Sequence, residues 1–154
     1  VVATNMGYPA DLSLYQSVKG MSAAAQACVP GGTIVLVAEC REGLGGREYV
    51  ELMRSEGSPA ALLDRFGAPD HATLHDQWGV QTQAMIQARF DVWMHSSLDP
   101  QTTESAHLRY APDVEGTLAR IIAGKRAELG REPTVCVLPH GQLTVPRVAR
   151  ESAA

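Results

Sequence analysis

The sequence has 154 residues, of which 45% are hydrophobic and 19% charged, and its formal net charge is −4. This length and composition fit one globular domain with a substantial apolar core. The acidic balance, spread without a block of like charges, argues against nucleic acid and anionic membranes as partners. The longest apolar run, residues 33–38, is also far shorter than the ~20 residues of a membrane span.

The first part of the chain predicts a strand, a helix and a second strand. Residues 1–4 have the pattern of a strand end, and a loop that holds glycine and proline follows them. The apolar residues of 13–28 recur at three-four spacing, and Ser13 with Gln16 fits a capping box. Residues 33–38 are apolar on both faces, which is typical of a central strand in a parallel sheet covered by helices.

The middle of the chain predicts three helices and a third strand. A short helix is expected over residues 49–54, and a second one begins after Ser58 and ends at Gly67. A longer helix is expected over residues 70–88, capped by its first residue, an aspartate. Residues 90–94 then predict a strand.

The last part of the chain completes the alternation of strand and helix. An irregular connection follows Asp99, Asp113 caps a helix that Gly130 closes, and residues 134–138 predict a fourth strand. The polar residues from Arg147 are expected to fray. The alternation predicts the α/β class: residues 1–154 form a single domain with a mostly parallel sheet flanked by helices on both faces.

Polar residues follow each predicted strand, at the edge where ligands bind in open α/β sheets. His95 and His140 lie there, but each stands alone, so packing or loop hydrogen bonds are favoured over acid–base chemistry. Near the same edge begins the helix that carries Tyr15, Gln16 and Lys19, whose phenol, amide and ammonium can converge. Together with the free N–H groups of a helix start they suit a small carboxylate. The alternative is an ordinary helix start with Lys19 in solvent.

Other candidate sites are weaker. The glycine-rich loop 43–46 lacks the full GxGxxG pattern, because Glu48 replaces the last glycine, so a dinucleotide site is disfavoured. His71 and His75 stand four apart on the expected helix without a third ligand, so no metal site is predicted. Cys40 ends a strand beside an arginine that would lower a thiol pKa, but without a nearby base it is expected to be structural.

Three cysteines, far apart and in no CxxC pattern, indicate a reducing compartment, so a cytoplasmic protein is expected. The sequence opens directly on a strand-like Val1-Val2, without a basic segment or a secretory signal. We therefore expect a piece of a longer protein whose amino-terminal part is absent.

The opening stretch resembles a family motif. Gly7-Tyr8-Pro9, Asp11 and residues 14–21, Leu-Tyr-Gln-Ser-Val-Lys-Gly-Met, resemble the carboxy-terminal domain of the nickel-dependent lactate racemase family. Residues 30–34 and 38–45 are similar to that family as well. Asn5-Met6-Gly7 stands where the family more often has paired glycines, so the loop beside the substrate differs, and the resemblance implies a 2-hydroxy acid without specifying lactate.

The resemblance implies a partner domain, amino-terminal and absent here, that carries a nickel pincer pyridinium nucleotide and two acid–base histidines. Racemisation in that family goes by hydride transfer from the 2-carbon of a 2-hydroxy acid to the cofactor. Tyr15, Gln16 and Lys19 match the family residues that hold the substrate, and Trp78 lies near an aromatic residue that borders the cofactor pocket. The alternative for Trp78 is a core position.

The resemblance assigns no catalytic residue and no metal ligand to this chain, so we expect the chain alone to be inert. A competing hypothesis is a non-enzymatic α/β module that binds a small anion or a protein partner. A nucleotide-binding relative is the third choice.

Overall fold

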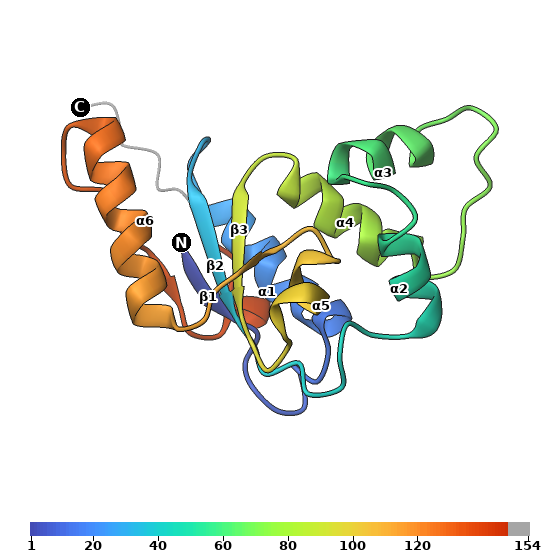
Figure 1. Ribbon diagram of the computed structural model, residues 1–154, viewed down its shortest axis with the longest axis horizontal. Coiled ribbons are helices and arrows are strands. Elements are labelled where there is room, and N and C mark those ends of the chain that lie inside the picture. The colour runs from blue at the N-terminus through green and yellow to red at the C-terminus, as the bar shows by residue number, and fades with distance from the viewer. Residues whose placement is uncertain (148–154) are drawn as a thin grey trace.

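The computed structural model describes residues 1–147 as five parallel strands with helices on both sides (Figure 1). The strand order is β4-β3-β2-β1-β5, and every pairing is parallel. In the central register, Val35 lies opposite Val2 on one side and Trp93 on the other. The strands are β1 Val2–Thr4, β2 Thr33–Val37, β3 Asp91–His95, β4 Arg109–Tyr110 and β5 Val137–Leu138.

Helices cover both faces of the sheet. The helices are α1 Leu14–Ala27, α2 Arg47–Met53, α3 Pro59–Phe66, α4 Gln77–Gln87, α5 Pro100–Glu104 and α6 Val114–Leu129, with the short 3₁₀ helix η1 Gly141–Leu143. Figure 1 shows α6 on one side of the sheet and α1 with α4 on the other, with α2 and α3 farther out. The predicted α/β class, with helices on both faces of the sheet, is thus confirmed. Among residues 1–147, no helix is long and apolar enough to cross a bilayer.

Side-chain caps begin three of the helices where the sequence predicts them. Ser13 Oγ accepts a hydrogen bond from the Gln16 N–H (3.4 Å), and Ser58 Oγ accepts one from the Ala61 N–H (3.2 Å). The Asp113 carboxylate accepts the N–H three residues along in the same way. Each cap satisfies a backbone donor that the first turn of a helix leaves free, which explains why these starts are readable from sequence.

The core lies between the sheet and α1 and continues among α2, α3 and α4. Strand β2 is buried on both faces, since neighbouring strands flank it and helices cover it, as its continuous apolar run predicts. Helix α1 turns Leu14, Val18, Met21 and Ala24 toward the sheet, each almost without exposed surface. This burial fixes which face of α1 remains for a ligand.

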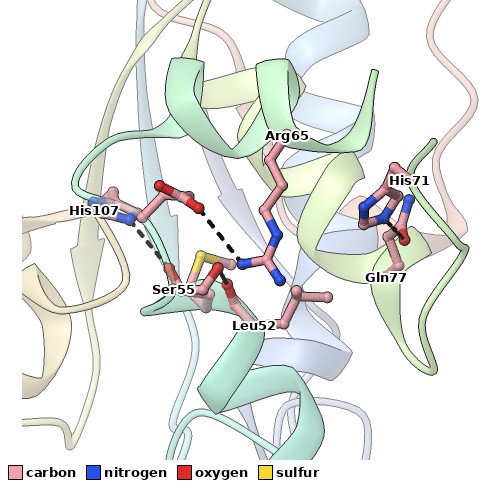
Figure 2. Close-up of polar contacts among 8 residues, drawn as sticks. Leu52, Ser55, Arg65, His71, Gln77 and His107 are labelled. Carbon is pink, nitrogen blue, oxygen red and sulfur yellow. Dashed lines mark hydrogen bonds and ion pairs between the residues drawn. The ribbon is translucent and has the colours of Figure 1, made fainter. Parts of the chain in front are cut away.

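The helix predicted over residues 70–88 is wrong in its first part. Helix α4 starts only at Gln77, and the segment before it is a loop. The side-chain oxygen Oε1 of Gln77 accepts a hydrogen bond from the Leu74 N–H (3.0 Å) and lies 2.8 Å from His71 Nε2 (Figure 2). Because the Gln77 side chain ties the loop back to the helix start, Asp70 caps nothing, and His71 and His75 do not share a helix face.

Three short elements, α5, β4 and η1, were not predicted, and one strand is shorter than predicted. Asp99 caps α5 by accepting the Thr102 N–H (2.8 Å), and β4 then pairs with β3 at the sheet edge. All three elements are too short for a periodic pattern. The strand expected over residues 134–138 is reduced to β5. The expectation that the chain frays from Arg147 concerns mainly residues 148–154, which lie outside the described part.

Candidate functional site

Tyr15 is seated between α1, α2 and α4. Its ring meets Tyr49 edge-on at 5.3 Å between ring centroids and Trp78 at 5.5 Å. A Cβ atom at Gly45 would lie 2.8 Å from Tyr15 Cβ, and one at Gly79 would lie 3.0 Å from Tyr15 Cε2. The two glycines therefore make room for the ring, and the two aromatic neighbours fix its orientation.

Consecutive buried hydrogen bonds fix the position of Tyr49, against which the Tyr15 ring packs. Tyr49 has no exposed surface, and its hydroxyl donates to Gln83 Oε1 at 2.5 Å. Gln83 Nε2 in turn donates to the Ala106 carbonyl oxygen at 3.0 Å. Burial raises the pKa of Tyr49, so this phenol stays neutral and acts as a fixed donor.

The Tyr15 hydroxyl lies 3.3 Å from Asp76 Oδ1. Burial raises the pKa of Tyr15 most, and the charge and hydrogen bond of Asp76 raise it further, while a hydrogen bond from Trp78 lowers it. Asp76 has a left-handed backbone (φ 58°) at the start of α4, and its other oxygen lies 3.4 Å from His75 Nδ1. Sequence reasoning missed Asp76, because 61 residues separate it from Tyr15 and no local pattern links them.

Gln16 and Lys19 lie on α1, as predicted. Lys19 is exposed one turn after Tyr15, and Gln16 is half-buried beside it. Within residues 1–147, neither side chain takes part in a hydrogen bond or an ion pair. An ammonium and an amide without intramolecular partners remain available to a ligand carboxylate.

The expectation that the start of α1 offers free N–H groups is wrong. Its first three N–H groups donate to the Gly43 carbonyl (3.1 Å), the Leu44 carbonyl (2.9 Å) and Ser13 Oγ (3.4 Å). The glycine-rich loop therefore caps the helix and is not a phosphate cradle. An anion near α1 would depend on side chains, above all on Lys19.

Trp78 is not a core residue. Its side chain is 53% exposed on α4 while its ring edge packs on Tyr15. The structure thus brings Trp78 and Tyr15 together from two helices. Met85, two turns farther along α4, is 48% exposed as well, so this face of the helix presents apolar surface.

A hollow of about 530 Å³ lies at the carboxyl ends of the strands, where the sequence predicts a ligand edge. Asp11 lies in it with Oδ2 accepting the Glu39 N–H (3.0 Å), and His95 Nδ1 bonds to the Ala111 carbonyl (3.0 Å). This bond agrees with a loop-fixing role for His95. None of the four predicted site residues lines this hollow, so the cluster around Tyr15 is a separate place. The hollow is lined by Thr4, Met6, Gly7, Asp11, Val37, Ala38, Glu39, His95, Ser96, Ser97 and Pro139.

The described residues do not fit a nickel centre. Within 1–147, no three histidine, cysteine, aspartate or glutamate side chains come together as ligands for a metal ion. His71 pairs with Gln77, and His75 with Asp76. These residues therefore hold no set of ligands through which a metal could act.

Cys40 is fully buried beside Ser17, whose hydroxyl lies 3.7 Å from the sulfur. Burial raises the pKa of the Cys40 thiol to about 12, with Asp11 and Glu39 adding to the effect and Ser17 opposing it. The lowering expected from Arg41 is absent, because that guanidinium stacks over the Tyr8 ring instead, at 4.7 Å. Cys40 is thus a protonated core group, as its structural interpretation requires.

We expect Cys40 to resist alkylation in the folded protein. At pH 9 roughly one Cys40 thiol in a thousand is ionised if its pKa is about 12. Iodoacetamide at pH 9, followed by peptide mass spectrometry, should modify half-buried Cys136 before Cys40, and denaturant should equalise them. Equal alkylation rates of Cys40 and Cys136 in the folded protein would contradict this prediction.

The raised pKa of Cys40 also makes the stability of the fold depend on pH. Because the thiol ionises near 9.0 in the unfolded chain, the free energy of unfolding falls as pH rises from 9.0 toward 12.

The family is decided by comparison with known proteins. A family model described as the lactate racemase C-terminal domain matches residues 1–145. The chain belongs to this family. The resemblance that the motifs around Tyr15 indicated is thereby confirmed.

This chain is similar to lactate racemases in both sequence and fold. The chain is 34% identical to lactate racemase of Lactiplantibacillus plantarum over 142 residues, which is 91% of this chain and 32% of that protein. It is 33% identical to lactate racemase of Thermoanaerobacterium thermosaccharolyticum over 152 residues, covering 96% of this chain and 34% of that protein. The structure of the lactate racemase apoprotein from T. thermosaccharolyticum superposes with a TM-score of 0.82 at 28% identity, over 96% of this chain and 35% of that one. The chain spans about a third of the length of these relatives.

Proposed function

We propose that residues 1–154 are the carboxy-terminal, substrate-contacting domain of a two-domain racemase or epimerase of 2-hydroxy acids. Membership of the lactate racemase family supports an isomerase of this kind. The observation that carries the proposal is the cluster on α1, where partner-free Lys19 and Gln16 adjoin a rigidly seated Tyr15. In this proposal, Lys19 and Gln16 hold the substrate carboxylate.

The exposure of Lys19 supports a second domain that covers the site. An ion pair in open solvent contributes only ~0–1 kcal/mol, because water screens it and the side chains lose entropy. The same pair is stronger once a covering surface excludes water. The exposed apolar surface of Trp78 and Met85 beside the cluster has the character of a surface that another domain covers.

The chemistry of the reaction is assigned to that other domain. By the family resemblance, it would carry the nickel pincer pyridinium nucleotide, which accepts and returns a hydride at the 2-carbon when bound. Tyr15, Gln16 and Lys19 would orient the acid, and Trp78 would border the cofactor pocket. We place the protein in the cytoplasm, in keeping with its sparse and unpaired cysteines.

Interconversion of enantiomers tests the proposed function. The two-domain protein, produced with its cofactor, is incubated with single enantiomers of several 2-hydroxy acids, and the products are separated by chiral chromatography. We expect racemisation or epimerisation of at least one acid by this protein and none by the 154-residue chain with added cofactor. Turnover by the chain alone would refute the division of labour. Binding without turnover by either protein would favour the non-enzymatic module.

A further inference from the structure

We propose that the residues preceding Val1 in the two-domain protein lengthen strand β1 and fill a cavity between α6 and the sheet. This inference rests on the proposed function in one respect, namely that another domain precedes these 154 residues. Support for that order comes from the family model, which is a C-terminal domain, and from the relatives, of which this chain spans about a third.

An open cavity of about 320 Å³ lies between α6 and the amino ends of β1, β2 and β5. Helix α6 is poorly covered there: Thr117 is its one buried residue, and Leu129 at its end is 47% exposed. Val29 and Val135 also line the cavity and are 71% and 45% exposed. Protein interiors seldom leave a gap larger than a water molecule, and exposed apolar patches mark interaction sites. This surface therefore has the character of an interface.

Strand β1 begins inside this cavity. The Val1 nitrogen donates a hydrogen bond to the Thr33 carbonyl oxygen of β2 at 2.7 Å. The Val2 N–H donates to the Cys136 carbonyl oxygen, beside β5, at 2.8 Å. All four residues line the cavity, and Figure 1 shows the amino terminus between α6 and β2. A residue joined to Val1 by a peptide bond therefore lies in the cavity as well.

The register of the sheet predicts the partners of that preceding residue. Because Val2 lies opposite Val137 in a parallel ladder, the residue before Val1 lies opposite Val135. Its carbonyl oxygen then faces the Cys136 N–H, for which residues 1–147 provide no acceptor. The sequence predicts a strand over residues 134–138, of which only Val137–Leu138 is formed. A longer β1 supplies the pairing that the first part of this strand lacks.

The size and the charges of the cavity fit a short apolar strand. The part of α6 that lines it, residues 118–129, is ~18 Å long, which five or six extended residues span at ~3.3 Å each. Alternate side chains of such a strand face α6. Lys125 is already engaged, since its Nζ donates to the Gly31 carbonyl (2.9 Å) and to the Glu128 carboxylate (2.8 Å). We therefore expect apolar side chains at alternate positions of the six residues before Val1.

The first test uses the two-domain protein and measures protection of thiols. Cys28 and Cys136 line the cavity and are half-buried, whereas Cys40 is buried elsewhere in the core. The six residues before Val1 are replaced by a glycine–serine sequence of equal length, which is flexible and brings no apolar side chain. Both proteins are treated with N-ethylmaleimide, and modification is followed by peptide mass spectrometry. We expect Cys28 and Cys136 to react at least tenfold faster in the glycine–serine variant, while Cys40 stays unmodified in both.

The other outcomes identify a different occupant or none. Protection of Cys28 and Cys136 in both proteins would show that another part of the partner domain covers the cavity. Protection that is lost on dilution would show that a second copy of the protein covers it. Rapid reaction in both proteins would show that the cavity is open. Each of these results would overturn the proposal. No turnover is measured, so the result does not depend on whether the protein racemises a 2-hydroxy acid.

The second test leaves the preceding segment unchanged. Leu129→Asp places a carboxylate in the cavity lining, and Ala127→Asp places one at an exposed position of the same helix turn that does not line the cavity. In the two-domain protein, Leu129→Asp should lower the melting temperature by several degrees more than Ala127→Asp and should speed the modification of Cys136, because a covered carboxylate loses its water. The two variants should differ less when the glycine–serine sequence precedes Val1. Equal effects of the two substitutions in the protein with its native segment would overturn the proposal.

Discussion

Lys19→Ala is expected to lower kcat/KM for a 2-hydroxy acid by about 10²-fold in the two-domain protein. A hydrogen bond to a charged group contributes ~1.5–3 kcal/mol, which corresponds to roughly 10- to 150-fold in rate or affinity. Lys19 supplies the only ammonium on the exposed face of α1, and within residues 1–147 no other side chain neutralises it. Steady-state kinetics with a single enantiomer measure the effect.

The control for Lys19 lies on the same helix. Gln26 is exposed seven residues farther along α1, so it shares the side of the helix but lies two turns away. Gln26→Ala should leave kcat/KM unchanged, and neither variant should shift the thermal midpoint measurably, because both side chains extend into solvent. A Lys19→Ala enzyme with wild-type kinetics would return this residue to an ordinary solvated role.

Gly20→Ala is expected to destabilise the fold, although alanine is the better helix former. A Cβ at this position would lie 2.9 Å from the Thr4 carbonyl oxygen and 3.0 Å from Asn5 Oδ1. The first of these atoms belongs to the backbone of β1's end, so α1 or the strand must shift. Such overpacking costs ~1–3 kcal/mol, which for a domain of this size lowers the melting temperature by roughly 2–12 °C.

In α6, in contrast to α1, replacing a glycine by alanine is expected to stabilise the fold. Gly124, in α6, is exposed and has no neighbour within 4 Å of a Cβ. Gly124→Ala should therefore stabilise the protein by ~0.5–1 kcal/mol through its helix propensity. Differential scanning calorimetry should show a lower melting temperature for Gly20→Ala and a higher one for Gly124→Ala than for the wild type. A stabilised Gly20→Ala would show that α1 and the end of β1 do not pack as closely as described.

Local patterns predicted those parts of the fold whose stabilising contacts lie within a few residues. Ser13, Ser58 and Asp113 cap helices through N–H groups three residues away, so their starts were read correctly. The start of α4 was misread because its loop is tied back by the Gln77 side chain, a choice among several polar residues that no propensity encodes. Elements as short as β4 owe their existence to pairing with β3 and carry no pattern of their own.

For the candidate site, the motif on α1 placed Tyr15, Gln16 and Lys19 on neighbouring positions of one helix, and the structure agrees. Spacing also suggested free helix N–H groups, which the loop from residue 43 in fact occupies. The contacts that hold the Tyr15 ring and its hydroxyl come from α2, α4 and the loop before α4, all far away in sequence.

By itself, the sequence of this protein determined the α/β class, the buried central strand, three helix starts and the family motif, because periodicity and capping are local. Only the tertiary structure decided that Gly20 must lack a side chain, that Trp78 lies exposed against Tyr15, and that Asp76 meets the Tyr15 hydroxyl. Each of these features depends on a contact between two segments that are distant in sequence, so it cannot be predicted from the spacing of residues along the chain. The face of α1 that is left for a ligand is decided in the same way, by what the sheet and α4 bury.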